Sequence, residues 1–245
     1  MTTLNQKVAL VTGASRGIGR AIAERLAQDG FTLALNYAGN VAKAEETAKA
    51  IEAAGGKAFA IQGDISQPAD VARVFDAAQA LGVLEVVVNS AGVMGMAKID
   101  EDNLEAFDQM IATNLRGTYL VLAQAAKRLR QGGRIIALSS TVIAKAFPHY
   151  GPYIASKAGV EGLVHVLANE LRGRDITVNA VAPGPVETEL FMQGKSEETV
   201  AQIANMSPLQ RIGQPDEIAA AVAFLAGPDG RWVNSQVLRV NGGMA

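Results

Sequence analysis

The stretch that decides the fold reads Val8-Ala9-Leu10-Val11-Thr12-Gly13-Ala14-Ser15-Arg16-Gly17-Ile18-Gly19. A short apolar run enters a turn with glycines spaced Gly-x-x-x-Gly-x-Gly, and apolar residues then recur at helical spacing. Glycines at a strand-to-helix turn let the backbone approach a phosphate closely, while N–H groups at the start of the helix point at the anion. The stretch predicts a strand, a phosphate-binding turn and a helix. Glycines alone would also fit a tight turn that binds nothing.

Short apolar runs of this kind alternate along the chain with segments of helical periodicity. Continuous apolar strands that alternate with helices are typical of a parallel sheet covered on both faces. No linker or change of composition divides the chain, so we expect a single α/β domain over residues 1–245, with a Rossmann fold. The seven predicted strands are 8–11, 33–35, 58–61, 86–88, 135–138, 177–181 and 237–240.

A long irregular stretch, at about 185–214, interrupts this alternation late in the chain. Loops of that length in compact domains are usually functional. We therefore expect this stretch to be a lid that closes over the substrate and excludes water.

Composition excludes several classes of protein. The chain has 22 basic and 24 acidic residues, so it carries no overall field that would attract nucleic acid or an anionic membrane. No stretch approaches the roughly 20 apolar residues that span a bilayer. The chain has no cysteine, and its two histidines lack spaced carboxylates, so we expect no metal site. Met1–Lys7 is short and polar, which indicates no signal peptide and a soluble cytoplasmic protein.

The end of the second predicted strand bears on the choice of nucleotide. Asn36 lies about 20 residues after the glycines, where an NAD-selective site usually places a carboxylate on the ribose. No carboxylate lies between Asp29 and Glu45, and Arg16 could pair with a 2′-phosphate. This pattern favours NADP(H) over NAD(H). The alternative is that Arg16 is a solvated surface residue.

Asp64 and Ile65 follow the third predicted strand. The carboxylate of Asp64 could accept a hydrogen bond from the adenine amine, or it could cap the helix that begins near Gln67. Both interpretations stay open, and we take Asp64 and Ile65 as candidate cofactor contacts.

Tyr153 is the only one of the four tyrosines with a lysine four residues later, at Lys157. On a helix this spacing places the phenol and the ammonium on one face. A nearby ammonium favours phenolate and would lower the pKa of Tyr153 from about 10, which would let it exchange protons with a substrate. Such a pair also arises by chance on solvated helices. Ser140, thirteen residues before Tyr153, adds a hydroxyl.

Together these residues resemble the short-chain dehydrogenase/reductase family over essentially the full length of the chain. Residues 12–19 match the family's cofactor turn, and 89–92 resemble its Asn-Asn-Ala-Gly element. The catalytic tetrad is matched by Asn114, Ser140, Tyr153 and Lys157, and the nicotinamide contacts by Pro183, Gly184, Val186 and Thr188. Within the family, the chain looks most like NADPH-dependent 3-oxoacyl-carrier-protein reductases and bacterial ketone reductases. The candidate cofactor-binding residues are Gly13, Ser15, Arg16, Gly17, Ile18, Gly19, Asn36, Asp64, Ile65, Asn89, Ala91, Gly92, Tyr153, Lys157, Pro183, Gly184, Val186 and Thr188.

The resemblance implies NADPH-dependent reduction of a ketone or 3-oxo group to a secondary alcohol, with the proton supplied by Tyr153. Ser140, rather than its neighbour Ser139, would donate a hydrogen bond to the substrate oxygen. Lys157 would hold the nicotinamide ribose as well as lower the pKa of Tyr153. Asn114 would hold a water that links Lys157 to solvent, unless it only satisfies helix backbone.

The chain departs from the family pattern in three places. Ser90 replaces the second asparagine of the Asn-Asn-Ala-Gly element, and Asn241 stands where many relatives have aspartate. Gln131 falls where relatives that dock an acyl carrier protein often have arginine, although Arg130 and Arg174 keep such docking possible. The expected partners are a small-molecule carbonyl substrate and, by resemblance, further copies of the chain in a homotetramer.

The substrate wall is predicted from segments that border the substrate in relatives. Apolar bulk at these positions would suit a hydrophobic ketone better than a sugar, although the same residues could fill the core or a subunit interface. The predicted wall residues are Met94, Met96, Phe147, Tyr150, Phe191 and Met192. Two other functions stay open, an NAD-linked alcohol or sugar dehydrogenase and a non-catalytic dinucleotide-binding sensor or scaffold. The intact tetrad argues against the scaffold.

Overall fold

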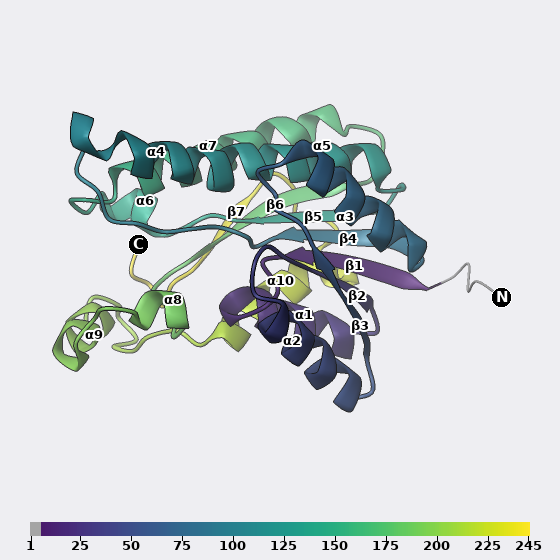
Figure 1. The fold of residues 1–245 in the computed structure, drawn as a ribbon, viewed down its shortest axis with the longest axis horizontal. Coiled ribbons are helices and arrows are strands. Elements are labelled where there is room, and N and C mark those ends of the chain that lie inside the picture. Colours follow the sequence, from purple (N-terminus) through teal and green to yellow (C-terminus); the bar gives the residue numbers. More distant parts are fainter. Residues whose placement is uncertain (1–5) are drawn as a thin grey trace.

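A seven-stranded parallel sheet forms the centre of the computed structural model, which describes residues 6–245 (Figure 1). The strand order is β3-β2-β1-β4-β5-β6-β7, so the chain reverses its direction of winding between β1 and β4. Each predicted apolar run lies inside an observed strand, which confirms the predicted α/β fold. The strands are β1 (Lys7–Thr12), β2 (Thr32–Tyr37), β3 (Lys57–Gln62), β4 (Val83–Asn89), β5 (Arg134–Leu138), β6 (Thr177–Pro183) and β7 (Val237–Val240).

Helices cover both faces of the sheet. Figure 1 shows α1, α2 and α10 on one face and α3, α4, α5 and α7 on the other. The helices are α1 (Gly17–Gln28), α2 (Val41–Ala53), α3 (Pro68–Ala80), α4 (Leu104–Met110), α5 (Thr118–Arg128), α6 (Val142–Lys145), α7 (Gly151–Glu170), α8 (Glu189–Met192), α9 (Glu197–Ala204) and α10 (Pro215–Ala226). Shorter elements are the 3₁₀ turns η1 (Glu101–Asn103) and η3 (Pro228–Gly230), and the π-helix η2 (Ile111–Gly117), which joins α4 to α5.

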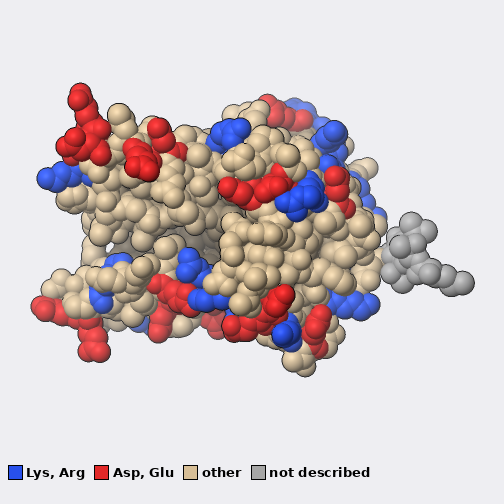
Figure 2. Space-filling view, viewed as in Figure 1, with Lys and Arg blue, Asp and Glu red and all other residues tan. Residues whose placement is uncertain are grey.

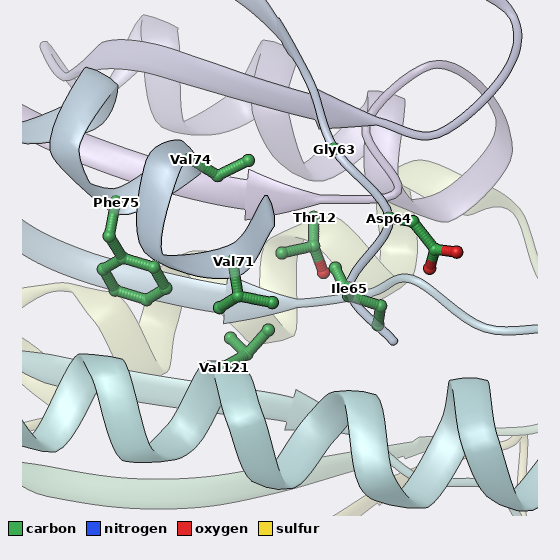
Figure 3. A pocket seen from close by; sticks show the side chains of 8 residues that line it. All are labelled: Thr12, Gly63, Asp64, Ile65, Val71, Val74, Phe75 and Val121. Carbon is green, nitrogen blue, oxygen red and sulfur yellow. The ribbon is translucent and has the colours of Figure 1, made fainter. Parts of the chain in front are cut away.

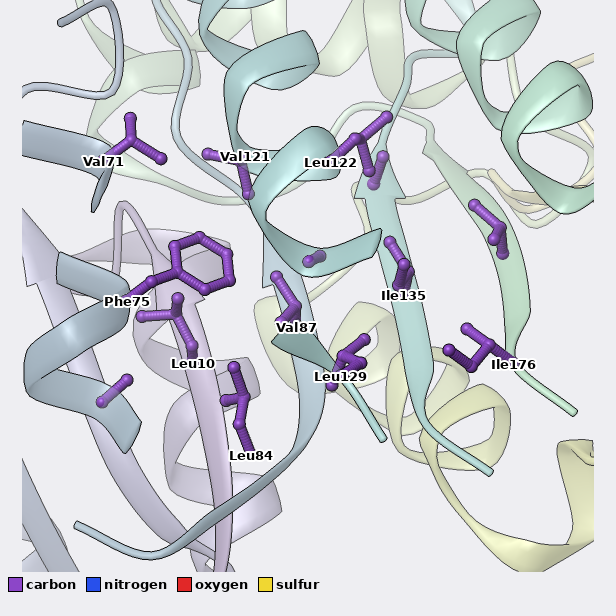
Figure 4. Close-up of a cluster of buried hydrophobic side chains, with 14 of the residues drawn as sticks. Leu10, Val71, Phe75, Leu84, Val87, Val121, Leu122, Leu129, Ile135 and Ile176 are labelled. Carbon is purple, nitrogen blue, oxygen red and sulfur yellow. The ribbon is translucent and has the colours of Figure 1, made fainter. Parts of the chain in front are cut away.

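The central strands β1 and β4 are mostly apolar because each of their faces packs against a layer of helices. Leu10 of β1 lies in the cluster that includes Phe75 of α3 and Val121 of α5 (Figure 4). The next residue, Val11, points to the other face and packs in the cluster that includes Ile22 of α1. Full burial of a side chain of this size stabilises the fold by roughly 1.5–3 kcal/mol. The helix layers on the two faces therefore stabilise the sheet, whose strand carboxyl ends carry the loops described below.

The predicted lid, residues 185–214, contains α8 and α9 and is tied at a narrow neck. Gly213 N donates to Pro185 O at 2.9 Å, and Glu187 N donates to Gly213 O at 2.9 Å. At its far side, Ser207 Oγ donates to Gly242 O at 2.7 Å, which fastens the segment to the C-terminal tail. The segment is therefore a loop closed at its base, with the two short helices α8 and α9 inside it.

Three sequence expectations concern targeting and metals. Over residues 6–245, no helix has both the length and the apolar character needed to cross a bilayer. The same range contains no group of three or more His, Cys, Asp and Glu side chains arranged to hold a metal ion. The expectation of no signal peptide concerns mainly residues 1–5, which lie outside the described residues, and the cytoplasmic location stays a prediction.

Candidate active site

A cavity of about 810 Å³ opens at the carboxyl ends of the strands. Figure 2 shows the surface hollowed between the upper layer of helices and the segment that carries α8 and α9. In sheets of this order, ligands bind where the winding reverses, outside the carboxyl ends of the strands. The cavity is lined by every catalytic and cofactor residue that the sequence predicts, except Asn89 and Asn114.

The glycine turn after β1 packs too closely for side chains. Gly13 has a φ of +65°, in the left-handed region, and a Cβ there would lie 2.7 Å from the Cα of Ala91. A Cβ on Gly19 would lie 2.2 Å from the carbonyl oxygen of Gly13. Helix α1 begins at Gly17, so its first N–H groups face the cavity, where they suit a phosphate.

Gly19→Ala is expected to open this turn, because its Cβ would meet the Gly13 oxygen at 2.2 Å. Overpacking of this kind costs about 1–3 kcal/mol, and binding of the expected cofactor, NADPH, should weaken about tenfold or more. Nicotinamide fluorescence titration and thermal unfolding measure the two effects. Gly39→Ala is the matched control, since Gly39 also lines the cavity but a Cβ there would meet nothing within 4 Å. Unchanged NADPH affinity in Gly19→Ala would contradict the expectation.

Asn89 is absent from the lining of the cavity, and its role as a direct cofactor contact stays a prediction. Its side chain is buried, accepts a hydrogen bond from Thr12 Oγ1 at 2.7 Å and donates to Thr118 Oγ1 at 2.7 Å. Thr12 Oγ1 in turn accepts from the N–H of Ala91 at 3.1 Å. Asn89 therefore positions the wall, by tying β4 to β1 and α5, because a buried amide must find partners within the protein.

Asn114 is fully buried in η2 and clamps two parts of the site together. Its Nδ2 donates to Val93 O at 2.8 Å and to Ser156 Oγ at 3.2 Å, while its Oδ1 accepts from Val93 N at 2.8 Å. Ser156 Oγ donates onward to Tyr153 O at 2.7 Å. The side chain thus fixes the loop after β4 against α7. Ser156 is absent from the residues that the sequence predicts, and the water relay through Asn114 stays a prediction.

Tyr153, Lys157 and Ser140 line one wall of the cavity, at the ends of α7 and β5 that face it. Lys157 Nζ lies 5.8 Å from the centre of the Tyr153 ring and donates to Leu138 O at 2.8 Å. The ring of Tyr150 packs edge-on against Tyr153, with centroids 6.5 Å apart. Ser139 Oγ, by contrast, donates to Glu161 at 2.6 Å. Ser140, which also lines the cavity, has no carboxylate partner among the described residues, and its role as the catalytic serine stays a prediction.

The prediction that Lys157 lowers the pKa of Tyr153 is wrong for this structure. Burial raises the pKa of Tyr153 to about 12; the Ser140 hydroxyl acts in the opposite direction, and Tyr150 adds to the rise. Burial also lowers the pKa of Lys157 to about 8, because the enclosed ammonium loses its hydration. Desolvation is the largest cause of the shift at both groups. At neutral pH the phenol keeps its proton, which suits Tyr153 to proton donation.

Near the end of β2, basic side chains line the cavity wall, whereas the side-chain amide of Asn36 is bound to backbone carbonyls. Asn36 is buried, and its Nδ2 donates to Gly63 O at 2.9 Å and to Ile61 O at 3.3 Å, so its role there is structural. Arg16 and Lys43 both line this part of the cavity. Lys43 is not among the predicted contacts, although it is a lysine inside the stretch without carboxylates. Two cations in this place fit a 2′-phosphate.

Asp64 accepts a hydrogen bond from Ser66 N at 2.9 Å, so it caps the turn before α3, whose own N-cap is Gln67. Its other carboxylate oxygen has no partner among the described residues. Figure 3 shows the carboxylate pointing away from a gap too narrow for a water molecule, between β1, α3 and α5. The side chains that line the gap include Thr12, Ile65, Val71, Val74, Phe75 and Val121. Asp64 thus remains available to a ligand as well as to the turn.

The substrate wall is apolar but differs in part from the predicted one. Met94, Phe147, Tyr150 and Phe191 line the cavity, whereas Met96 is 69% exposed and Met192 is 38% exposed, outside it. The structure therefore gives no support to Met96 and Met192 as wall residues. Further apolar lining comes from the segment 185–214 and the C-terminal tail, at Leu190, Ile203, Met206 and Met244. The segment 185–214 and the C-terminal tail are far from Met94 in the sequence, and only the tertiary fold brings their side chains to the same cavity.

Comparisons with known proteins agree with this geometry. The family model described as Enoyl-(Acyl carrier protein) reductase matches residues 13–245. A chloroplastic NADPH-dependent aldehyde reductase-like protein of Arabidopsis thaliana is 43% identical over 97% of this chain and 93% of its own. A Staphylococcus aureus 3-oxoacyl-acyl-carrier-protein reductase is 42% identical, over 97% and 98%. A short-chain dehydrogenase from Burkholderia cenocepacia, solved with NADP, is 37% identical with a TM-score of 0.90, and 98% of each chain is covered.

The residues present fit the NADP(H) named for two of these proteins. The glycine turn and the start of α1 line the cavity where a pyrophosphate would lie, and Arg16 and Lys43 line it where a 2′-phosphate would lie. Asn114, Ser140, Tyr153 and Lys157 occupy one end of the same site. The chain belongs to the short-chain dehydrogenase/reductase family and is an NADP-dependent oxidoreductase.

Proposed function

We propose that this protein uses NADPH to reduce the carbonyl group of a hydrophobic small molecule, a ketone or 3-oxo compound, to a secondary alcohol. The observation that carries the proposal is the position of the Tyr153 phenol, which lies beside Ser140 in a cavity with an apolar wall. Burial raises the pKa of this phenol, which favours its protonated form. A group that keeps its proton at neutral pH is suited to act as an acid, and a reduction needs an acid at the carbonyl oxygen.

Bound NADPH supplies the hydride to the carbonyl carbon. Tyr153 donates its proton to the oxygen as negative charge develops there. An alcohol is about as weak an acid as water and far weaker than a phenol, so Tyr153 transfers its proton downhill even with its pKa raised to about 12. Ser140 donates a hydrogen bond to the same oxygen, and the ammonium of Lys157 stabilises the phenolate that Tyr153 becomes.

The apolar wall supports hydrophobic carbonyl compounds as the substrate class. Relatives named for aldehydes and for 3-oxoacyl groups suggest two such chemistries. Acyl carrier protein docking has weak support, because Arg130 forms an ion pair with Glu85 and Arg174 donates to the carbonyls of Ala126 and Leu129. We therefore favour free small molecules over carrier-bound acyl groups.

A homotetramer is also proposed, from the family resemblance. The helices that pack across subunits in relatives contain Asn114 and Tyr153. Exposed apolar side chains on this layer, at Phe107, Tyr119 and Val166, support such packing. Light scattering in solution would give the subunit number.

A screen of NADPH oxidation at about 340 nm tests the proposed reaction. Acetoacetyl thioesters, aryl ketones, diketones and aliphatic aldehydes cover the candidate substrates. Turnover of hydrophobic ketones is the expected result. NADP(H) binding without turnover of any carbonyl would instead favour the sensor or scaffold, and turnover confined to alcohols with NAD would favour the dehydrogenase.

The pH dependence of the reaction is expected to follow Lys157. Because burial lowers the pKa of Lys157 to about 8, its positive charge is present below that pH and lost above it. The kcat/KM for NADPH should therefore be level from about pH 6 to 7.5 and fall about tenfold for each unit well above pH 8, since it reports groups of the free enzyme. Initial rates at constant ionic strength, with the fold checked by circular dichroism, measure the profile. A level profile up to pH 9.5 would contradict this role of the lysine.

A further inference from the structure

Glu189 connects the two cations that line the ribose end of the cavity. Lys43 Nζ lies 2.5 Å from each carboxylate oxygen of Glu189, and Arg16 Nη1 lies 3.3 Å from Oε2. The three residues come from α8, α2 and the glycine turn, and all three line the cavity. In Figure 2, basic and acidic atoms lie together along the lower rim of the hollow. The carboxylate thus occupies the position that an anionic ligand of Arg16 and Lys43 would take.

Glu189 is the first residue of α8, directly after Thr188, whose side chain accepts a hydrogen bond from Phe191 N at 3.1 Å. The carboxylate is therefore delivered by the lid. Lys43, followed by Arg16, lowers the pKa of the Glu189 carboxyl, so it stays charged at neutral pH. Its side chain is 61% exposed, which leaves it free to turn into solvent when a stronger anion arrives.

We propose that Glu189 is a specificity-determining residue, an internal anion that competes with the 2′-phosphate of NADP(H) for Arg16 and Lys43. The inference rests on the proposed NADPH-dependent function. A phosphate monoester carries a charge of about −1.5 to −2 and three acceptor oxygens, so it displaces a carboxylate that carries −1. NADH has no 2′-phosphate and leaves the bridge intact. Glu189 therefore reduces the preference for NADPH over NADH below what Arg16 and Lys43 alone would give.

Glutamine at this position keeps the shape of the side chain and removes its charge. The two cations then lose their internal partner, and a 2′-phosphate no longer displaces an anion. Ligands without a 2′-phosphate gain little, because they do not reach the same cations. The prediction is specific to one phosphate group, which separates it from a general loosening of the lid.

Isothermal titration calorimetry with 2′,5′-ADP and with 5′-AMP tests this on the full chain, at low salt. Glu189→Gln should bind 2′,5′-ADP about fivefold more tightly than the unsubstituted protein, and 5′-AMP within about twofold. Added salt should shrink the gain. Glu46→Gln is the matched control: it removes the same charge from an ion pair with Arg20 on the same face, at a side chain that is 64% exposed.

Three results would overturn the proposal. One is unchanged or weaker binding of 2′,5′-ADP by Glu189→Gln, with thermal unfolding showing an intact fold. Another is equal tightening of both ligands, as a freed lid would give. The third is the same gain in Glu46→Gln, as a general charge effect would give. Neither probe contains nicotinamide or a carbonyl, so failure here would leave the proposed reduction standing, and failure of the carbonyl screen would leave this result standing.

Discussion

Tyr153→Phe is expected to lower kcat for carbonyl reduction by about 10²–10⁴-fold, the usual contribution of a positioned acid. Phenylalanine keeps the ring, which packs against Tyr150, but removes the phenolic proton that the proposed reaction transfers to the substrate oxygen. The affinity for NADPH should change by less than about twofold, because the hydroxyl acts on the substrate. An effect on kcat with little effect on cofactor binding is therefore the expected signature.

Single-turnover absorbance changes and fluorescence titration measure the two quantities for Tyr153→Phe separately. Tyr150→Phe is the matched comparison, since it removes a hydroxyl from the neighbouring ring of the same cavity and should cost far less. If Tyr153→Phe reduced the substrate at more than about a tenth of the original rate, the phenol would not be the proton donor.

Lys157→Met is expected to impair catalysis and at the same time to stabilise the fold. Without an ammonium, the phenolate that Tyr153 becomes has no nearby positive charge, and kcat/KM should fall about a hundredfold or more. Stability should change in the opposite direction, because the lowering of the Lys157 pKa from 10.5 to about 8 measures the cost of burying its charge. That cost is about 3 kcal/mol. Loss of the hydrogen bond to Leu138 O offsets about 1 kcal/mol of the gain.

The net gain of about 2 kcal/mol should raise Tm by roughly 4–8 °C at pH 7. From about pH 8 to 10.5 the folded protein loses the Lys157 proton before the unfolded chain does, so the original protein gains stability with pH across that window. The advantage of Lys157→Met should therefore shrink as the pH rises. Thermal unfolding without cofactor, at pH 7 and pH 9.5, measures both. Lys49→Met, at an exposed lysine, should show neither effect.

The order of strands and helices is predictable because both faces of this sheet are covered. A run such as Val86-Val87-Val88 is apolar at every position, since alternate side chains enter opposite cores. The glycine turn is equally predictable from the sequence, because contacts as short as those around Gly19 leave no space for a side chain at that position. Tyr153 and Lys157 follow from the period of one helix.

The remaining features depend on where separate segments meet. Nothing local to Asn89 shows that its partners are Thr12 and Thr118 instead of a ligand. The raised pKa of Tyr153 depends on how much protein surrounds it, which spacing alone does not give. The bridge from Glu189 to Lys43 joins residues 146 positions apart. Long-range packing of this kind leaves no periodic trace in the sequence.

The neck formed by Pro185 and Gly213 has an evolutionary consequence. Two backbone hydrogen bonds close the segment at its base, and the residues assigned to proton transfer lie outside it, on η2, α7 and after β5. Changes of sequence between Thr188 and Gly213 can therefore alter the cavity wall while the residues assigned to proton transfer keep their places. Paralogues could in this way diverge in the molecules they accept while sharing one ancestral proton donor.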